Sequence, residues 1–430
     1  MTTITRLESN VRSYCRSFPK TLKSASGSIV HDDSGKSYID FFAGAGSLNY
    51  GHNPTPLKKA LLEYIEGDGI SHALDLTTES KVAFLDTFSK RILEPRKLDY
   101  KVMFPGPTGT NAVESALKIA RKVTGRTEVI AFTNAFHGMT LGSLALTGNA
   151  GKRKGAGVAL TGVTRMPFDG YMGDRVNTID YLDRVLSDTS SGVPLPAAII
   201  VESVQGEGGI NVASEGWLRD LERVTHKHGA LLILDDIQVG CGRLGDFFSF
   251  EKAGIKPDIV CLSKSISGYG LPFALTLMHR DIDALSPGEH NGTFRGNNLA
   301  FVTAKAALDE YWADDTLMLQ VKEKSAYLQK RLLAMRAKHG GEYRGRGFLQ
   351  GIAFEDTTVA SAASKEAFER GVLIETSGQN DEVLKVLAPL TISHADLTRG
   401  LDIVETSLEL VMSERRIVPT LRPSEISALS

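Results

Sequence analysis

From about Tyr100 onward, short apolar runs alternate with amphipathic helical stretches. Within each run the residues are almost continuously apolar, which indicates strands buried on both faces, and the helices between them are typical of parallel crossover connections. The runs are YKVMF (100–104), EVIAFT (128–133), AAIIVESV (197–204), ALLILDD (230–236), DIVCLS (258–263) and FALTLM (273–278). The sequence therefore predicts an α/β domain with a mostly parallel sheet over roughly residues 65–310.

A different pattern follows a long helical zone at 298–340. Further strands are predicted within 346–356, 371–378 and 382–392, and helices within 361–370 and 395–416. This pattern predicts a smaller α+β domain over 311–430, which the N-terminal segment 1–64 joins. The last dozen residues, rich in serine with two prolines, are expected to form a loose tail.

The composition limits the kinds of molecule that this protein is expected to bind. With 430 residues, 42% of them hydrophobic, the chain is longer than one average domain. Its net charge of -2 gives no electrostatic reason to expect nucleic acid or an anionic membrane as a partner. Cys15, Cys241 and Cys261 are too scattered for a disulfide framework or a zinc site, so we expect no metal. A polar N-terminus and the lack of a long apolar run predict a cytoplasmic protein.

The stretch FPGPTGTNAVESALKIAR joins a strand to a helix that begins near Thr110. Free backbone N–H groups and the helix dipole make such a junction a phosphate site, and Gly109 permits close approach. An ordinary capped helix start would give the same sequence. The stretch lacks the Gly-Lys-Ser/Thr of a Walker loop and the full Gly-x-Gly-x-x-Gly dinucleotide pattern.

Acidic and amide side chains follow two more predicted strands. Asp235 and Asp236 end ALLILDD with Gln238 just beyond them, and Glu202 ends another strand before Glu207, which lies among glycines. A buried carboxylate needs a cationic or hydrogen-bonding partner, and a protonated ring nitrogen would serve Asp235. An aspartate that caps the following turn is the alternative. We expect Glu202 to contact a bound cofactor and Glu207 to contact a substrate.

An aromatic residue and a lysine complete the set. Phe136 and His137 follow the strand at 128–133, where a lone aromatic is usually part of the core; we assign His137 to the substrate. Lys264 follows DIVCLS, and a partly buried lysine is a nucleophilic amine able to bind an aldehyde covalently. A phosphate site, a stacking aromatic, an acid and an amine are the attachments that pyridoxal phosphate needs.

In this chain order, the residues resemble the class III, or ω-amino-acid, aminotransferases, which are fold type I pyridoxal-phosphate enzymes. The likeness runs from IDFFAGAGSLNYGHNP (39–54) through RGRGFLQGIAFE to VLKVLAPLTI. It implies that Lys264 is catalytic and binds the cofactor aldehyde, that Asp235 holds the ring nitrogen and that Gln238 contacts the ring hydroxyl. It further implies that Phe136 stacks on the ring and that the amides of Gly109 and Thr110 hold the phosphate.

The resemblance also implies self-association. GTFRGNN (292–298) matches a segment that, in this family, reaches from the neighbouring subunit. Thr293 would then contact the phosphate of the other active site, and a homodimer would be the smallest functional unit.

The chain departs from the family pattern at informative positions. Many ornithine and 4-aminobutyrate aminotransferases have arginine where Met139 and Lys385 stand, and related enzymes have acidic residues at Asn111 and Glu at Asp236. Since lysine lacks the planar fork of arginine, carboxylate recognition must be rearranged. We expect Lys385 to bind substrate and to pair with Glu207 while a diamine is bound.

FPGPTGTNAVESALKIARKVTGR, AFHGMTLGSLALTGN and MPFDGYMGD are similar to the diaminobutyrate:2-oxoglutarate aminotransferases, especially those that supply ectoine synthesis. This likeness implies transfer from L-glutamate to L-aspartate 4-semialdehyde, which gives 2-oxoglutarate and L-2,4-diaminobutyrate. An ornithine, acetylornithine or 4-aminobutyrate aminotransferase is the nearest alternative. A nucleotide-linked dehydrogenase is more remote, because it leaves Lys264 and Asp235 without roles, and a non-catalytic binding protein would leave Lys264 dispensable.

Overall fold

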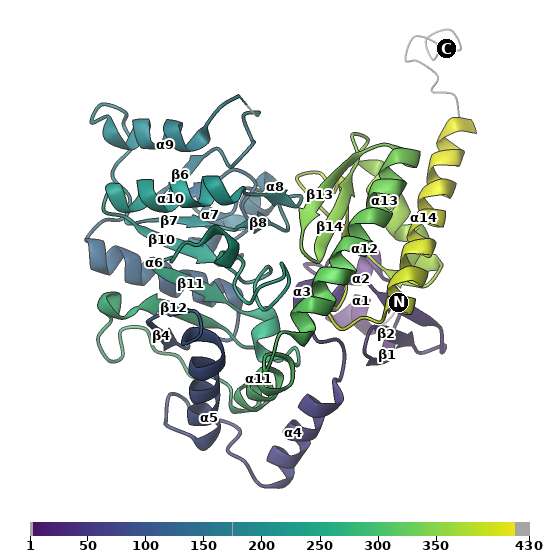
Figure 1. Cartoon of the computed structure of the whole chain (residues 1–430), viewed down its shortest axis with the longest axis horizontal. Helices are drawn as coiled ribbons and strands as arrows, with labels where there is room; N and C mark the ends of the chain where they lie inside the picture. Colours follow the sequence, from purple (N-terminus) through teal and green to yellow (C-terminus); the bar gives the residue numbers. More distant parts are fainter. Residues whose placement is uncertain (1–2, 174, 418–430) are drawn as a thin grey trace.

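A seven-stranded sheet forms the centre of the larger part of the molecule (Figure 1). The computed structural model describes residues 3–173 and 175–417. Strand β12 is antiparallel to both of its neighbours, and the other neighbouring strands are parallel, which confirms the predicted mostly parallel sheet. The strand order is β4 (Tyr100–Met103), β12 (Leu275–His279), β11 (Ile259–Leu262), β10 (Leu231–Asp235), β7 (Ala198–Val201), β5 (Val129–Phe132) and β6 (Val163–Met166).

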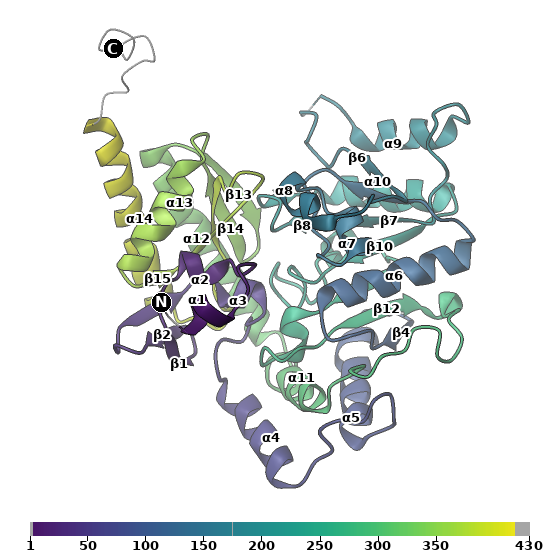
Figure 2. The ribbon, with the colours of Figure 1, turned by 180° about the vertical axis from the view of Figure 1, so that it is seen from behind.

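Strand β7 shows why the apolar runs barely alternate. Ile199 and Val201 belong to a core cluster that also contains residues of helix α10, whereas Ala198 and Ile200 belong to a second cluster with residues of helix α6. Helix α10 is in front of the sheet in Figure 1, and α6 is in front in Figure 2. Because successive side chains point to opposite faces, a strand covered on both faces needs an apolar residue at every position.

The helices of this larger part connect its strands or pack around them. Helix α6 begins at the predicted junction, at Gly109. The elements are α4 (Thr55–Glu66), α5 (Glu79–Phe88), α6 (Gly109–Thr124), α7 (Leu141–Leu146), α8 (Ala150–Arg153), α9 (Thr178–Ser187), α10 (Glu215–Lys227) and α11 (Asn298–Tyr311), with β8 (Val204–Gln205) paired to β9 (Asn211–Val212).

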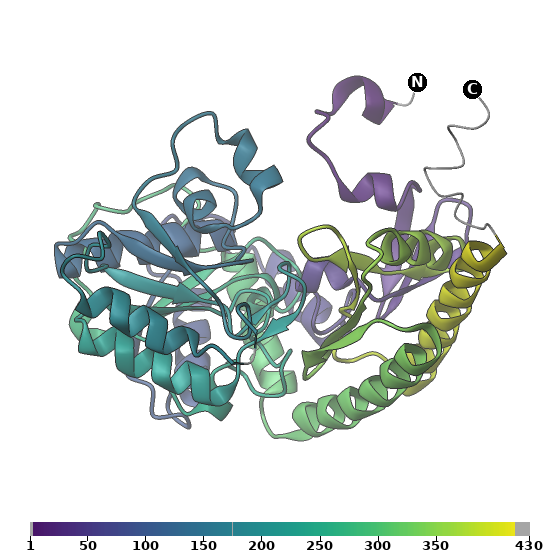
Figure 3. The same ribbon diagram turned by 90° about the horizontal axis from the view of Figure 1, so that it is seen from above.

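The smaller part contains two four-stranded sheets (Figure 3). One has the order β13 (Glu342–Arg346), β14 (Leu349–Ala353), β17 (Val383–Val386) and β16 (Glu375–Ser377); the other has β1 (Leu22–Ser26), β2 (Ile29–Asp32), β3 (Ser37–Asp40) and β15 (Val372–Leu373). The remaining helices are α1 (Thr3–Leu7), α2 (Tyr14–Ser17), α3 (Ala43–Gly46), α12 (Thr316–His339), α13 (Thr358–Glu369) and α14 (His394–Ile417). Through the parallel pair β3 and β15, the N-terminal segment packs with the C-terminal part.

The structure adds detail that the sequence patterns did not predict. The helical zone at 298–340 is two helices, α11 and α12, separated at Trp312–Asp315, and strands β1–β3, β6 and β13 were not expected. The expected tail lies outside the described residues. Over the described ranges, no helix combines the length and apolar character needed to cross a bilayer.

Candidate active site

Asp235, the last residue of β10, pairs with His137. The Nδ1 atom of His137 lies 2.7 Å from Asp235 Oδ2, and Asp235 Oδ1 accepts a hydrogen bond from the Ile237 amide at 3.1 Å. Both side chains are buried. A hydrogen on Nδ1 would let the imidazole donate to this carboxylate, whose charged form only accepts. The imidazole therefore orients the carboxylate at the carboxyl edge of the sheet, where open α/β sheets bind ligands.

Glu202 follows β7 and holds the chain at Phe136. Its Oε1 atom accepts a hydrogen bond from the Phe136 amide at 2.9 Å. Burial, and then the neighbouring Asp235 charge, raise the pKa of Glu202 well above its usual range. Glu202 thus brings the Phe136 backbone next to the strand ends that carry Asp235.

Lys264 lies directly beyond β11, at the start of a 3-10 turn (η4, Lys264–Ser267). Its φ of 52° is in the left-handed region, which is uncommon for a residue other than glycine. The turn is held in place because Ser265 Oγ donates to the Gly46 carbonyl at 2.8 Å and Thr303 Oγ1 donates to the Ser267 carbonyl at 2.7 Å. These bonds fix the backbone from which the lysine projects.

Burial lowers the pKa of the Lys264 amine, and the neighbouring Glu207 carboxylate partly opposes that shift. A lowered pKa increases the fraction of neutral amine at neutral pH. The neutral amine is the form that attacks an aldehyde or accepts a proton.

The first turn of α6 packs closely on the loop that follows Asp235. A Cβ atom on Gly109 would lie 2.9 Å from Ile237 Cδ1, so a side chain there would push the two segments apart. Thr110 Oγ1 lies 2.6 Å from Thr140 Oγ1, which in turn donates to Glu114 Oε1 at 2.6 Å. The sequence analysis did not identify Glu114, a helical residue with no distinguishing pattern.

Gln238 connects the loop after β10 with two other segments. Its Nε2 atom donates to the Ala45 carbonyl at 3.2 Å and to Glu207 Oε1 at 3.0 Å. Its Oε1 atom is buried and has no hydrogen-bond partner among the described residues. Gly206 leaves the room for this side chain, because a Cβ atom there would lie 1.7 Å from Gln238 Oε1.

A buried lysine lies between two carboxylates beside Gln238. Lys385 Nζ lies 2.9 Å from Glu207 Oε1 and 2.9 Å from Glu375 Oε1, and its side chain is fully buried. Although burial lowers it, the two carboxylates raise the pKa of Lys385 above its ordinary value. Likewise, Lys385 and Lys264 outweigh burial and hold the pKa of Glu207 well below its usual range.

The sequence analysis missed Glu375, the first residue of β16. Burial raises the pKa of Glu375 to about 7. The residue lies inside GVLIETSG, a stretch that was interpreted only as a strand. A charged residue in an otherwise apolar strand was the signal that could have identified it.

Two cavities meet beside this cluster. One of about 710 Å³ is lined by residues around Phe136 and by the segment after β16, and one of about 540 Å³ extends toward Tyr14. Both are lined by Lys152, Glu207, Thr376 and Asp381. They provide space for a small molecule between the two parts of the chain.

Thr293 is the predicted site residue that lies apart from the other predicted site residues in the described chain. It is exposed, in a loop before α11, and no hydrogen bond joins it to the other candidate residues within the described chain. The neighbouring Phe294 ring contacts His72 at 5.3 Å between centroids and is 66% exposed.

Comparison with known proteins places the chain in a family. Residues 13–408 match the model of the class-III aminotransferases. The chain is 56% identical over 421 residues to a diaminobutyrate–2-oxoglutarate transaminase of Halalkalibacterium halodurans, with 97% of this chain and 98% of the relative covered. It is 59% identical over 396 residues to the enzyme of that name from Streptomyces anulatus, with 92% and 94% covered.

Solved structures agree with this family. The ornithine aminotransferase of Toxoplasma gondii matches with a TM-score of 0.84 at 26% identity, over 96% of this chain and 94% of that one. An S-selective transaminase of an Arthrobacter species matches with a TM-score of 0.83 at 22% identity, over 95% and 96%. The predicted fold, that of the fold type I pyridoxal-phosphate-dependent transferases, is confirmed. The chain belongs to the class-III aminotransferases.

Proposed function

We propose that the protein is a pyridoxal-phosphate-dependent aminotransferase that transfers the amino group of L-glutamate to the terminal carbon of L-aspartate 4-semialdehyde. The products are 2-oxoglutarate and L-2,4-diaminobutyrate, and the reaction supplies the first intermediate of ectoine synthesis. The observation that carries this proposal is identity above one half, over nearly the whole chain, to relatives named for this reaction.

The residues present fit the cofactor. Asp235 offers a buried carboxylate to the ring nitrogen, and the free Oε1 of Gln238 is an acceptor for the ring hydroxyl. Phe136 offers its ring, the first turn of α6 at Gly109 and Thr110 offers amide donors, and Lys264 offers its amine. When bound, pyridoxal phosphate takes up the amino group and withdraws electrons from the reacting carbon of the substrate.

The protein's own groups perform the remaining tasks. Asp235 holds a proton on the ring nitrogen, and His137 keeps that carboxylate oriented through Nδ1. Lys264 Nζ moves the proton from the substrate carbon, for which its lowered pKa suits it. Glu202 keeps Phe136 against the ring through the Phe136 amide.

Glu207 and Lys385 allow one site to serve two kinds of substrate. With a diamine bound, the Glu207 carboxylate neutralises Lys385 at 2.9 Å. With glutamate or 2-oxoglutarate bound, Lys385 exchanges Glu207 for a carboxylate of the substrate. Gln238 and Glu375 contact the same pair and supply alternative partners during the exchange.

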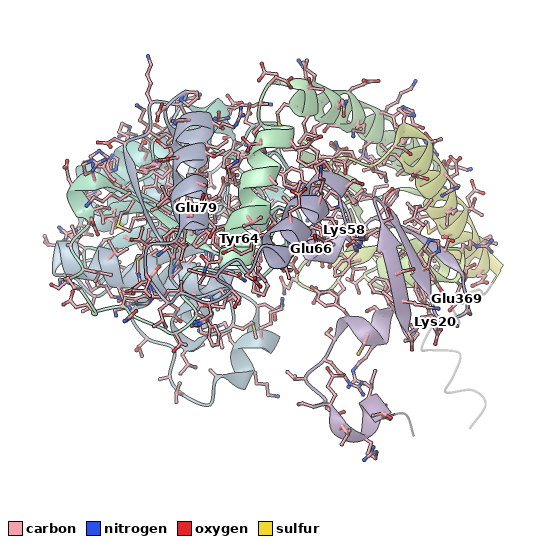
Figure 4. All side chains as sticks on the ribbon, turned by 90° about the horizontal axis from the view of Figure 1, so that it is seen from below. Lys20, Lys58, Tyr64, Glu66, Glu79 and Glu369 are labelled. Carbon is pink, nitrogen blue, oxygen red and sulfur yellow. The ribbon has the colours of Figure 1, made fainter. Side chains whose placement is uncertain are left out.

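A homodimer, in which Thr293 contacts the phosphate in the neighbouring subunit, completes the proposal. The supporting observation is a group of apolar residues, Ile65, Ile70, Leu74, Leu76 and Phe294, whose side chains are about half exposed or more. Figure 4 shows helix α4 with Tyr64 and helix α5 with Glu79; Ile70, Leu74 and Leu76 lie in the segment between these helices, and the Phe294 ring contacts His72 of the same segment. Exposed apolar patches of this kind are typical of protein interfaces.

The domain division and location belong to the same proposal. Residues 65–310 would form the cofactor-binding domain and 311–430 the small domain. The β3–β15 pair supports the folding of the first part of segment 1–64 onto the small domain, whereas α4 at its end contacts α11 of the larger part. A cytoplasmic location suits the three free cysteines.

The test compares L-2,4-diaminobutyrate, L-ornithine and 4-aminobutyrate as amino donors to 2-oxoglutarate. We expect the highest kcat/KM with diaminobutyrate. Efficiency with ornithine equal to that with diaminobutyrate would instead support an ornithine aminotransferase, the activity of the structural neighbour from Toxoplasma gondii. Lys264→Ala, with Lys264→Arg beside it, should lose the visible absorption of the bound cofactor, because neither side chain binds its aldehyde covalently.

A further inference from the structure

We propose that Lys152 is a specificity-determining residue that binds the carboxylate of L-2,4-diaminobutyrate remote from the reacting amine. The inference rests on the proposed function, and it identifies the side chain that binds the part of the substrate that does not react.

Lys152 is a cation without an anionic partner, beside the reaction site. Its side chain is exposed and lines both cavities together with Glu207. The Nζ atom lies 4.3 Å from the centroid of the Phe136 ring, and no carboxylate pairs with it among the described residues. An ammonium group held beside an aromatic face and open to a cavity is available for a ligand anion.

The backbone that carries Lys152 is firmly anchored. The Lys152 amide donates to Asn149 Oδ1 at 3.0 Å, which caps the short helix α8. The next residue, Arg153, donates through Nη1 to the carbonyls of Leu144, Ala145 and Thr147 at 3.3, 3.1 and 3.2 Å. The position of Lys152 relative to Phe136 is therefore set by the fold, and only its flexible side chain has to adjust to a ligand.

Three other cations near the cavities already have partners, and Lys365 lines only the smaller cavity. Arg165 lines the larger cavity, but its Nη2 atom donates to the carbonyls of Ala145 and Thr147. Lys385 is paired with two carboxylates, and Arg16 donates to the carbonyls of Arg12 and Asn10. Lys152 is thus the free cation shared by both cavities, within the described residues.

The cavity lining matches the charge pattern of the diamine's unreacting end. That end carries a carboxylate and an ammonium group on one carbon. Lys152 supplies a positive charge to both cavities, and Asp381 supplies a negative charge to both.

The experiment compares L-2,4-diaminobutyrate with 1,3-diaminopropane, which has the same chain without the carboxylate, as donors to 2-oxoglutarate. Lys152→Met should lower kcat/KM for diaminobutyrate about tenfold, mainly through KM, and change the value for diaminopropane less than about twofold. Lys152→Arg should restore the preference. Lys154→Met, which removes a nearby exposed lysine outside both cavities, should behave as wild type.

Three results would overturn the inference. The first is an equal loss for both donors in Lys152→Met, which would show a general structural role. The second is an unchanged ratio of the two donors in that variant at an unchanged thermal midpoint. The third is a wild-type holoenzyme that is inactive with diaminobutyrate but active with another donor, which would refute the proposed function and this inference with it.

Discussion

The Nζ atom of Lys385 lies 2.9 Å from Glu207 Oε1, and the lysine side chain has no exposure to solvent. A buried ammonium group is stable only with anionic partners, so when Glu207 leaves Lys385 another anion must take its place. The pair therefore links the charge of the bound substrate to the conformation of Glu207.

Replacing Lys385 with alanine should raise KM for glutamate and 2-oxoglutarate about tenfold or more, because one of their carboxylates loses its cation. Removing one partner of a buried ion pair should also cost about 3 kcal/mol of unfolding free energy. Lys385→Arg is the matched control, and we expect it to keep dicarboxylate binding. Steady-state kinetics with both substrates checks this, and unchanged KM values in a folded Lys385→Ala variant would contradict the exchange.

Glu375 should make stability depend on pH in a defined window. Since burial raises its pKa to about 7 in the folded protein, the folded state binds more protons than the unfolded state between about pH 4.5 and 7. The contribution of Glu375 to stability is therefore greatest below about pH 4.5 and is lost as the pH rises through 7.

The comparison of wild type with Glu375→Gln isolates this effect. The pKa of Glu207 lies below the window and that of Lys385 above it, so neither titrates within it. The difference in unfolding free energy between the two proteins should change by about 3 kcal/mol from pH 4.5 to 7.5. Urea unfolding at several pH values measures it, and a difference independent of pH would show that Glu375 does not titrate there.

Gly206→Ala should disturb Gln238 without disturbing the core. The new Cβ atom would lie 1.7 Å from Gln238 Oε1, so the amide must move and lose its bond to Glu207. We expect cofactor affinity to fall about tenfold, measured by absorbance titration of the apoprotein. Gly216→Ala in α10, where a Cβ atom meets nothing within 4 Å, is the control that should retain affinity. Equal affinity of both variants would mean that Gln238 does not contact the cofactor.

Phe294→Glu should weaken self-association, because it places a charge in the exposed apolar surface next to Thr293. We expect sedimentation velocity to show a larger fraction of monomer, together with lower activity at low protein concentration. Leu319→Glu on α12 replaces a side chain of similar exposure, 65%, and should leave the distribution of species unchanged. A wild-type protein that sediments as an active monomer would refute the dimer.

Sequence patterns predicted β7, β10 and β11 of the central sheet because these strands are covered on both faces, which requires an unbroken apolar run, but they missed the half-buried edge strand β6. They did not predict β1, whose residues LKSAS are mostly exposed and polar and which is defined by pairing with β2. The position of α12 as a separate helix was missed because residues 298–340 contain no proline or glycine break before Gly340.

The candidate site also contains residues whose positions could be predicted and residues whose positions could not. The positions of Asp235, Glu202 and Lys264 were predictable because each lies at the end of a recognisable strand, and the structure brings Asp235 and Glu202 together through Phe136 and His137. The positions of Lys152 and Glu375 beside the cavities were not predictable, because they depend on which segments the fold places there. No local sequence pattern encodes that long-range proximity.

The double-sided packing of β7 has a consequence for how specificity can change in this enzyme. Ile199 and Ile200 pack into core clusters on opposite faces of the sheet, so a shift of β7 by one residue would place each side chain on the wrong face. Glu202, at the end of this strand, is therefore held in place with it. Lys152 and Asp381 lie outside the sheet, and their side chains are exposed, so either residue can be replaced without moving a strand. Substitutions that redirect the enzyme to new amines should therefore accumulate at such positions, while the reacting centre stays unchanged.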